Sequence, residues 1–124
     1  MPTLTNSEID DIEGLLGFRL PGLYRTLLVM EGFGPIGSSG EIYDPRLVRE
    51  LYESFFEDTN QLFALYVPFG CDRKAQELWV INAREETAAA LWHETVPEDW
   101  PDETWLPYEE WVSRYLDPIV GENL

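Results

Sequence analysis

The sequence predicts an α+β fold in which helices pack on a mainly antiparallel β-meander. Two amphipathic helical segments precede any strand, three strand-length apolar runs then follow one another, and a helical segment comes last. The connections between the apolar runs are short enough for hairpins, which favours antiparallel pairing over parallel strands with long crossovers. With 124 residues and no internal repeat or linker, the chain fits one domain spanning residues 1–124.

The first two helices have clear start signals. Thr5 and Glu8 have the spacing of a capping box, so we expect a helix to begin there and to end at Gly17. Pro21 suits the first turn of a second helix, which we expect to run to about Met30. The apolar residues of both segments recur at helical spacing, so each helix should bury one face.

The middle of the chain is expected to be a loop, a short strand and a third helix. Residues 32–37 match the letters of a dinucleotide-binding loop, but they follow a helix rather than a strand, so we interpret them as a glycine-rich loop. We expect a short strand at Glu41–Tyr43 and a third helix from Pro45 to about Phe56, with Asp44 as its cap.

Three strands and a final helix complete the prediction. The strands are expected at Leu62–Val67, Glu77–Asn82 and Ala88–His93. Residues 94–106 are rich in proline, acid and tryptophan without periodicity, so we expect an ordered loop there. Pro107 should then begin the last helix.

The charge of the chain restricts its partners. The sequence has 24 acidic residues against 8 Lys and Arg, a formal charge of -16. Such a chain repels phosphate backbones and anionic membranes, so we expect no binding to nucleic acid or membrane and favour a basic protein partner. Neither a signal peptide nor a membrane-spanning stretch is evident, and Cys71 is the only cysteine, so we expect a cytoplasmic location. The sequence leaves the oligomeric state open, and we favour a monomer.

Few residues suggest catalysis or metal binding. His93 is the only histidine, and neither the Ser38-Ser39 pair nor Cys71 lies in a nucleophile-elbow pattern. We therefore expect no enzymatic activity, no cofactor and no metal, and interpret His93 as a half-buried residue at a strand edge. A hydrolase that uses His93 stays open as an alternative.

Acidic residues gather towards the C-terminus. From Glu85 onward there are eleven carboxylates and the single Arg114, a balance of -10. Aromatic anchors ringed by charge are typical of protein-binding patches. We therefore predict a partner-binding site with tryptophan anchors and a carboxylate rim: Trp100, Trp105, Glu94, Glu98, Asp99, Asp102 and Glu103. The alternative is that both tryptophans close the open end of the core.

Six segments resemble, in order, motifs of the SUKH superfamily, which includes fungal Smi/Knr-type cell-wall assembly regulators and many bacterial immunity proteins. The segments are Leu15–Pro21 with Tyr24-Arg25, Gly40–Pro45, Val67–Gly70, Glu77–Asn82, Ala90–Glu94 and Tyr108–Val112. One departure is clear. The family usually has an acidic, glycine-rich turn after the third segment, whereas Cys71–Gln76 contains Arg73 and Lys74 and no glycine.

The resemblance implies a protein-binding role. Members of the superfamily act either as immunity proteins that neutralise a cognate toxin, often a nuclease, or as regulatory interaction modules. The acidity of the chain fits the first role, because a nuclease has to be cationic to hold nucleic acid. Two alternatives stay open: a regulatory module that binds a host protein, and a small-molecule site in a groove lined by Trp79, Trp92 and Trp100.

Overall fold

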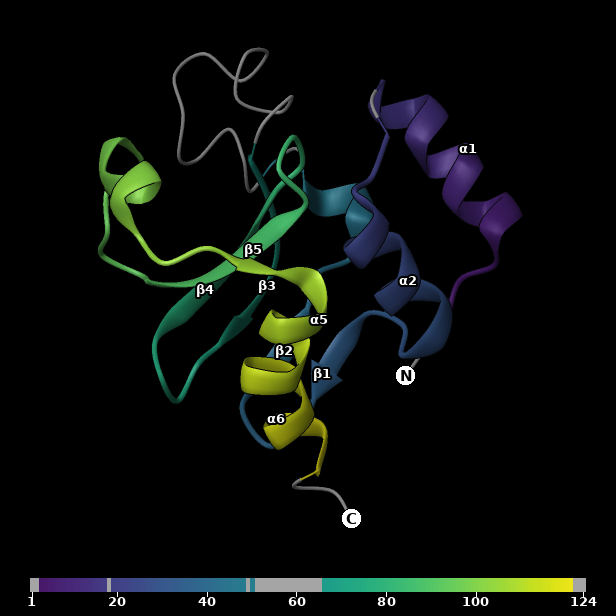
Figure 1. Cartoon of the computed structure of the whole chain (residues 1–124). Coiled ribbons are helices and arrows are strands. Elements are labelled where there is room, and N and C mark those ends of the chain that lie inside the picture. The colour runs from purple at the N-terminus through teal and green to yellow at the C-terminus, as the bar shows by residue number, and fades with distance from the viewer. Residues whose placement is uncertain (1–2, 18, 49, 51–65, 122–124) are drawn as a thin grey trace.

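The computed structural model describes residues 3–17, 19–48, 50 and 66–121, and it confirms the predicted α+β class (Figure 1). Two N-terminal helices are followed by a six-stranded antiparallel sheet and a C-terminal helix. The helices are α1 (Asn6–Leu16), α2 (Gly22–Met30), α5 (Tyr108–Trp111) and α6 (Asp117–Gly121), with a π-helical segment, η3 (Val112–Leu116), between the last two. The strands are β1 (Gly34–Ile36), β2 (Gly40–Ile42), β3 (Tyr66–Asp72), β4 (Glu77–Asn82), β5 (Thr87–Trp92) and β6 (Leu106–Pro107). Two 3-10 helices are η1 (Pro45–Leu47) and η2 (Pro97–Asp102).

The first two helices form as their sequence signals predict. The Thr5 hydroxyl accepts a hydrogen bond from the Glu8 amide at 3.1 Å, and the Glu8 carboxylate accepts one from the Thr5 amide, also at 3.1 Å. Gly17 ends α1 in the left-handed region, with φ of 81°. The capping box therefore fixes where α1 begins, and the glycine fixes where it ends.

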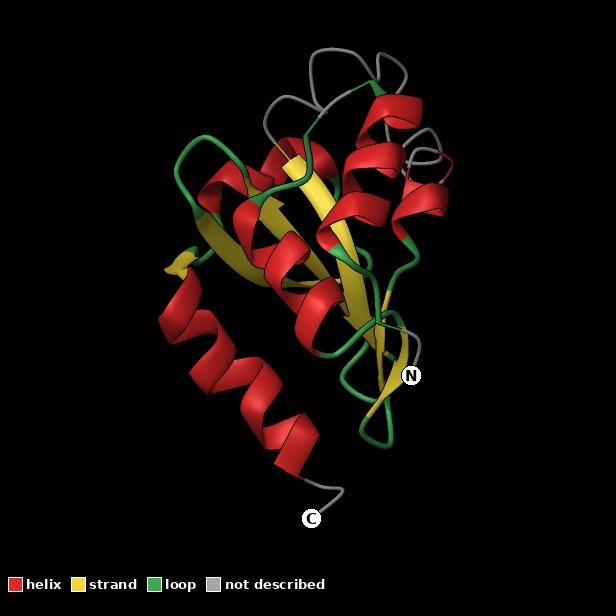
Figure 2. Cartoon of the chain, turned by 90° about the vertical axis from the view of Figure 1, so that its right-hand side faces the viewer, coloured by secondary structure: helices red, strands yellow, loops and turns green. Residues whose placement is uncertain are grey.

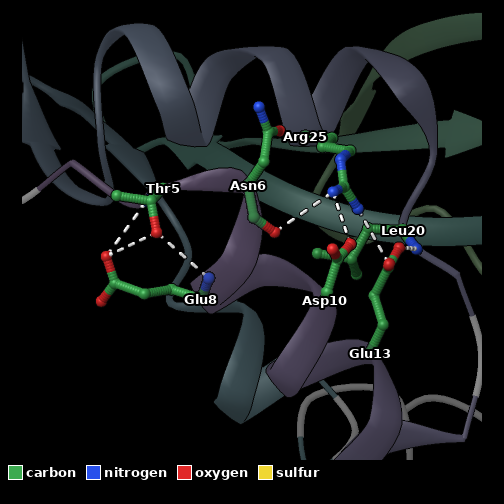
Figure 3. A network of polar contacts seen from close by, with 7 residues as sticks. All are labelled: Thr5, Asn6, Glu8, Asp10, Glu13, Leu20 and Arg25. Carbon is green, nitrogen blue, oxygen red and sulfur yellow. Dashed lines mark hydrogen bonds and ion pairs between the residues drawn. The ribbon is translucent and has the colours of Figure 1, made fainter.

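One arginine joins the two helices. Arg25 on α2 contacts the Asp10 carboxylate at 2.6 Å and the Glu13 carboxylate at 2.8 Å, and it donates to the Asn6 carbonyl at 3.3 Å (Figure 3). Glu13 also accepts the Leu20 amide at 2.6 Å, which ties the link between the helices to α1. Arg25 thus pairs with two of the four carboxylates of α1.

The sheet is a simple meander in which each strand pairs with the next one in the sequence. β4 matches its predicted range, and β5 is displaced by one residue from the prediction. β3 corrects the sequence interpretation, because it continues through Pro68 to Asp72 where a hairpin connection was expected. The pairing of β3 with β4 shifts between Pro68 and Gly70, so a bulge at this point lets a strand contain a proline. The predicted strand residues before Tyr66 lie outside the described part of the chain.

Two short strands, β1 and β6, were not predicted, and they form the two edges of the sheet. β1 lies inside the segment expected to be a glycine-rich loop, and β6 lies at the end of the segment expected to be a loop. Both strands contain proline, Pro35 in one and Pro107 in the other. The predicted third helix begins as the 3-10 helix η1, capped by Asp44, and its predicted continuation over residues 51–56 lies outside the described residues.

Aromatic residues form the centre of the core on one face of the sheet. Trp79 of β4 lies 6.1 Å from Phe69 and 5.4 Å from Trp111 of α5, between ring centroids. Glycines make room for the Trp79 ring: a Cβ atom at Gly70 would lie 2.7 Å from its Cε3 atom, and one at Gly40 would lie 3.2 Å from its Cη2 atom. This face of the sheet is called the Trp79 face below.

The C-terminal helix crosses one face of the sheet (Figures 1 and 2), and the contact between Trp111 and Trp79 identifies it as the Trp79 face. Figure 2 shows β6 leading directly into this helix, and α5 contacts β5 and β6. At the other end, Ile119 of α6 packs so closely on the β1–β2 turn that a Cβ atom at Gly37 would lie 2.3 Å from its Cγ2 atom. The helix therefore covers the sheet from the start of β5 to the turn between β1 and β2.

The hairpin turns at residues 73–76 and 83–86 are built alike. The side chains of Asp72 and Asn82 each accept hydrogen bonds from the amides two and three residues further on, at 3.0 to 3.3 Å. Gln76 and Glu86 close the two turns with φ of 56° and 55°, a conformation that glycine usually adopts. The turn after β3 therefore forms without the glycines of the SUKH motif.

Candidate partner-binding surface

The predicted anchor Trp100 is part of the core. It lies in η2 with only 1% of its surface exposed, its ring meets Tyr66 edge-on at 5.6 Å, and its indole nitrogen donates to the Thr95 carbonyl at 3.2 Å. Because the ring is enclosed, it cannot serve as an exposed anchor. The alternative interpretation from the sequence, in which this tryptophan closes the core, describes its position.

Trp105 is half-buried and holds the same segment in place. Its ring stacks on Tyr66 at 5.5 Å with an angle of 25° between the planes. Its indole nitrogen donates to the Trp100 carbonyl at 2.8 Å. Both predicted anchors thus fix the path of residues 95–105 against the sheet.

The five predicted rim carboxylates are all exposed, and the segment that the tryptophans hold carries most of them. They are Glu94, Glu98, Asp99, Asp102 and Glu103. Of these, Glu94 lies 3.8 Å from the His93 ring, and within the described part of the chain the other four have no basic group at ion-pair distance. All five carboxylates together are called the acidic rim below. The structure therefore keeps the predicted rim at the surface and removes one predicted anchor from it.

Negative charge is balanced differently in the two parts of the molecule. Near the N-terminus, Arg25 forms ion pairs with two carboxylates, and Arg46 pairs with Asp44 at 2.7 Å. Between residues 85 and 121, by contrast, all ten carboxylates are exposed. Among these described residues the only arginine pair joins Arg114 to Glu110, at 3.9 Å. The C-terminal part therefore carries an excess of exposed negative charge, with η2 and the C-terminal helix holding it on opposite faces of the sheet.

His93 lies in the turn after β5, not within a strand as predicted. Its amide donates to the Gln76 carbonyl at 2.8 Å, its Nδ1 atom lies 3.2 Å from the same oxygen, and its ring contacts Trp92 at 5.6 Å. Its side chain is 49% exposed. His93 thus connects the turn after β5 to the turn between β3 and β4, where Gln76 lies.

Cys71 and Tyr43 form a separate polar pair on β3 and the segment after β2. Burial, followed by charge repulsion from Cys71, raises the pKa of Tyr43, and burial raises the pKa of the Cys71 thiol. A thiol with a raised pKa is mostly protonated near neutral pH and is a poor nucleophile. Cys71 therefore has a structural environment rather than an activating one.

Trp92 is an exposed aromatic residue that the predicted site omitted. Of its surface 55% is exposed, and Val96, four residues later, is 49% exposed. Trp79 and Trp100 are both buried, and strand alternation places Trp79 and the Trp100 partner Tyr66 on opposite faces of the sheet. The three tryptophans therefore do not line one groove, and the small-molecule groove suggested by the sequence is not formed.

A different groove lies between α2, the β4–β5 turn and α5. It has a volume of about 590 Å³, and its lining combines apolar Leu23 and Val112 with Tyr108, Glu86 and Glu109. Burial, followed by repulsion from Glu86, raises the pKa of the Tyr108 phenol, so this group stays protonated near neutral pH. Two of the ten exposed carboxylates described above, Glu86 and Glu109, therefore line this groove.

No group of three or more potential metal ligands occurs among the residues that the structure describes. In the same part of the chain, no helix combines the length and the apolar character that a bilayer-spanning helix needs.

Comparisons with known proteins give no match, neither to a family model nor to a curated protein. The fold and the surface define an acidic α+β domain with exposed carboxylates on its C-terminal third.

Proposed function

We propose that this chain is a non-enzymatic protein-binding domain that covers a basic surface of its partner, in the manner of an immunity protein that neutralises a cationic toxin. The observation that carries the proposal is the excess of exposed negative charge in residues 85–121, whose ten carboxylates are all exposed. Exposed charges of one sign accelerate encounter with a partner of opposite sign and select against other partners.

A nuclease toxin is the class of partner that fits this surface best. A nuclease has to present cationic groups to hold a phosphate backbone, and an anionic protein that occupies those groups competes with the nucleic acid. The order of segments that resembles the SUKH superfamily supports the same role. A regulatory module of the Smi/Knr type that binds a basic host protein is the second candidate, because the same surface suits it.

The test needs the product of a toxin-like gene beside the gene for this chain. Association is measured by stopped flow at 25 to 500 mM salt, together with rescue of toxin-expressing cells. We expect a 1:1 complex whose association rate falls steeply with salt, because added ions screen exposed charges. A salt-independent association rate would remove the electrostatic argument.

A matched pair of variants locates the surface. The rim variant reverses two carboxylates of the acidic rim, Asp99→Lys and Asp102→Lys. The control variant reverses two exposed carboxylates elsewhere, Asp11→Lys and Glu50→Lys. Both variants change the net charge equally, so only position differs. We expect the rim variant to associate about tenfold more slowly than the control variant. Equal rates for the two variants would place the interface outside the rim.

A further inference from the structure

One corner of the Trp79 face is left open by the C-terminal helix. Asp72, Glu77 and Trp92 are directly paired neighbours on β3, β4 and β5, and Glu77 lies two residues from Trp79. Paired residues and alternate residues of a strand share a face, so all three side chains belong to the Trp79 face. The helix covers other parts of this face, and at this corner Trp92 remains 55% exposed. These three residues are called the Trp92 corner below.

The Trp92 corner has two carboxylates without a cation. Burial, followed by repulsion from Asp72, raises the pKa of Glu77. Among the described residues no basic group lies within ion-pair distance of either carboxylate, and the nearby Arg73 lies 3.6 Å from Glu41 instead. A partly buried carboxylate beside a like charge is unfavourable for folding, and a cation from outside would relieve it.

The Trp92 corner is also held in shape by its surroundings. The Thr95 amide donates to the Trp92 carbonyl at 2.9 Å, and the His93 amide donates to the Gln76 carbonyl at 2.8 Å, so two hydrogen bonds close the chain around the end of β5. The His93 ring packs against the Trp92 ring at 5.6 Å. Since these contacts already order the backbone, binding here costs little further ordering.

We propose that the Trp92 corner is a socket for an arginine side chain of the basic partner, with the guanidinium stacked on the Trp92 indole and donating to the carboxylates of Glu77 and Asp72. This inference rests on the proposed function and names the contact that such a partner makes. Arginine fits better than lysine, because its planar group stacks on an aromatic ring and donates two parallel hydrogen bonds to a carboxylate.

The socket predicts opposite effects of one substitution on stability and on binding. Because the pKa of Glu77 is raised in the folded protein, its carboxylate binds more protons in the folded state than in the unfolded state. The folded protein therefore loses stability as pH rises above about 4.5, the ordinary pKa of glutamate. Glu77→Gln removes this loss, and we expect it to raise the unfolding temperature at pH 7 and to flatten its fall with rising pH. The same variant should bind arginine more weakly, which a purely structural role for Glu77 would not produce.

Nona-arginine and nona-lysine peptides, which carry equal charge, are suitable probes. The chain has five tryptophans, and their indole N–H signals can be followed separately by NMR during titration at 50 mM salt. We expect nona-arginine to shift the Trp92 indole signal most strongly and to bind several-fold more tightly than nona-lysine. Trp92→Ala should weaken nona-arginine binding about 3- to 30-fold, and Glu77→Gln several-fold. The control Leu15→Ala removes another exposed apolar residue, 81% exposed on α1, and should leave binding unchanged.

The outcomes separate this inference from the proposed function. The socket is wrong if both peptides bind equally and neither Trp92→Ala nor Glu77→Gln changes the affinity for them. If the rim variant still lowers that affinity, the proposed acidic surface stands. If the cognate basic partner fails to bind even at low salt, the proposed function is wrong as well. A Trp92 signal that shifts with protein concentration alone would indicate contact between two copies of the chain and would overturn the socket.

Discussion

The contrast between two tryptophans gives the sharpest test of the structure. Trp100 has 1% of its surface exposed, whereas 55% of Trp92 is exposed. A buried aromatic side chain removes about 200 Å² from water, worth about 5 kcal/mol at about 25 cal/mol per Å². Since the denatured state is partly compact, we expect Trp100→Ala to lower the free energy of unfolding by about 4 kcal/mol. Trp92→Ala should lower it by less than about 1 kcal/mol.

The assay for both variants is urea unfolding followed by circular dichroism, which does not depend on the tryptophan that was removed. A loss of about 4 kcal/mol at a typical slope of about 1.5 kcal/mol/M moves the midpoint by roughly 2.7 M. Should Trp100→Ala fail to fold, Trp100→Phe provides the measurement, with an expected loss of about 1–2 kcal/mol. Equal losses for the alanine variants at the two positions would refute the assignment of Trp100 to the core.

Three further predictions concern the scaffold. Gly70→Ala should lower the free energy of unfolding by about 2–3 kcal/mol, because its Cβ atom would lie 2.7 Å from Cε3 of Trp79 and 2.5 Å from a backbone carbonyl of β2; an unchanged urea midpoint would contradict this. Arg25→Lys should cost about 1 kcal/mol in the same assay, because lysine cannot donate from a planar fork to the carboxylates on α1, including the largely buried Glu13. Cys71 should react with iodoacetamide at pH 8 at least tenfold more slowly in the folded protein than in urea, because burial raises its pKa, and equal rates would refute the buried environment.

The elements that could be predicted have local causes. The capping box at Thr5 and the proline at position 21 locate α1 and α2, because both signals act within one helical turn. β4 was predicted with its observed limits, since a run of aliphatic and aromatic residues between polar turns matches the pattern of a buried strand.

The elements that were missed depend on partners far away in the sequence. β1 contains glycine and proline and exists because β2 pairs with it, which the residues of β1 alone do not indicate. β3 passes through Pro68 because a bulge removes the conflict with the pairing strand. Similarly, the acidic rim could be located from composition, but composition could not show that Trp100 is enclosed while Trp92 is exposed. Alternation along β5 gave no such signal, because it places Trp92 on the Trp79 face, which holds the aromatic core; Trp92 is exposed at the last residue of the strand.

The two short edge strands limit how another molecule can attach to this sheet. β1 has three residues and β6 has two, and each includes a proline, which has no amide hydrogen to offer an incoming strand. Extension of the sheet by a peptide or by a second copy of the chain is therefore disfavoured along β1 and β6. Under the proposed function, recognition uses side chains on the faces and turns, so its specificity can change through single substitutions while the backbone stays the same.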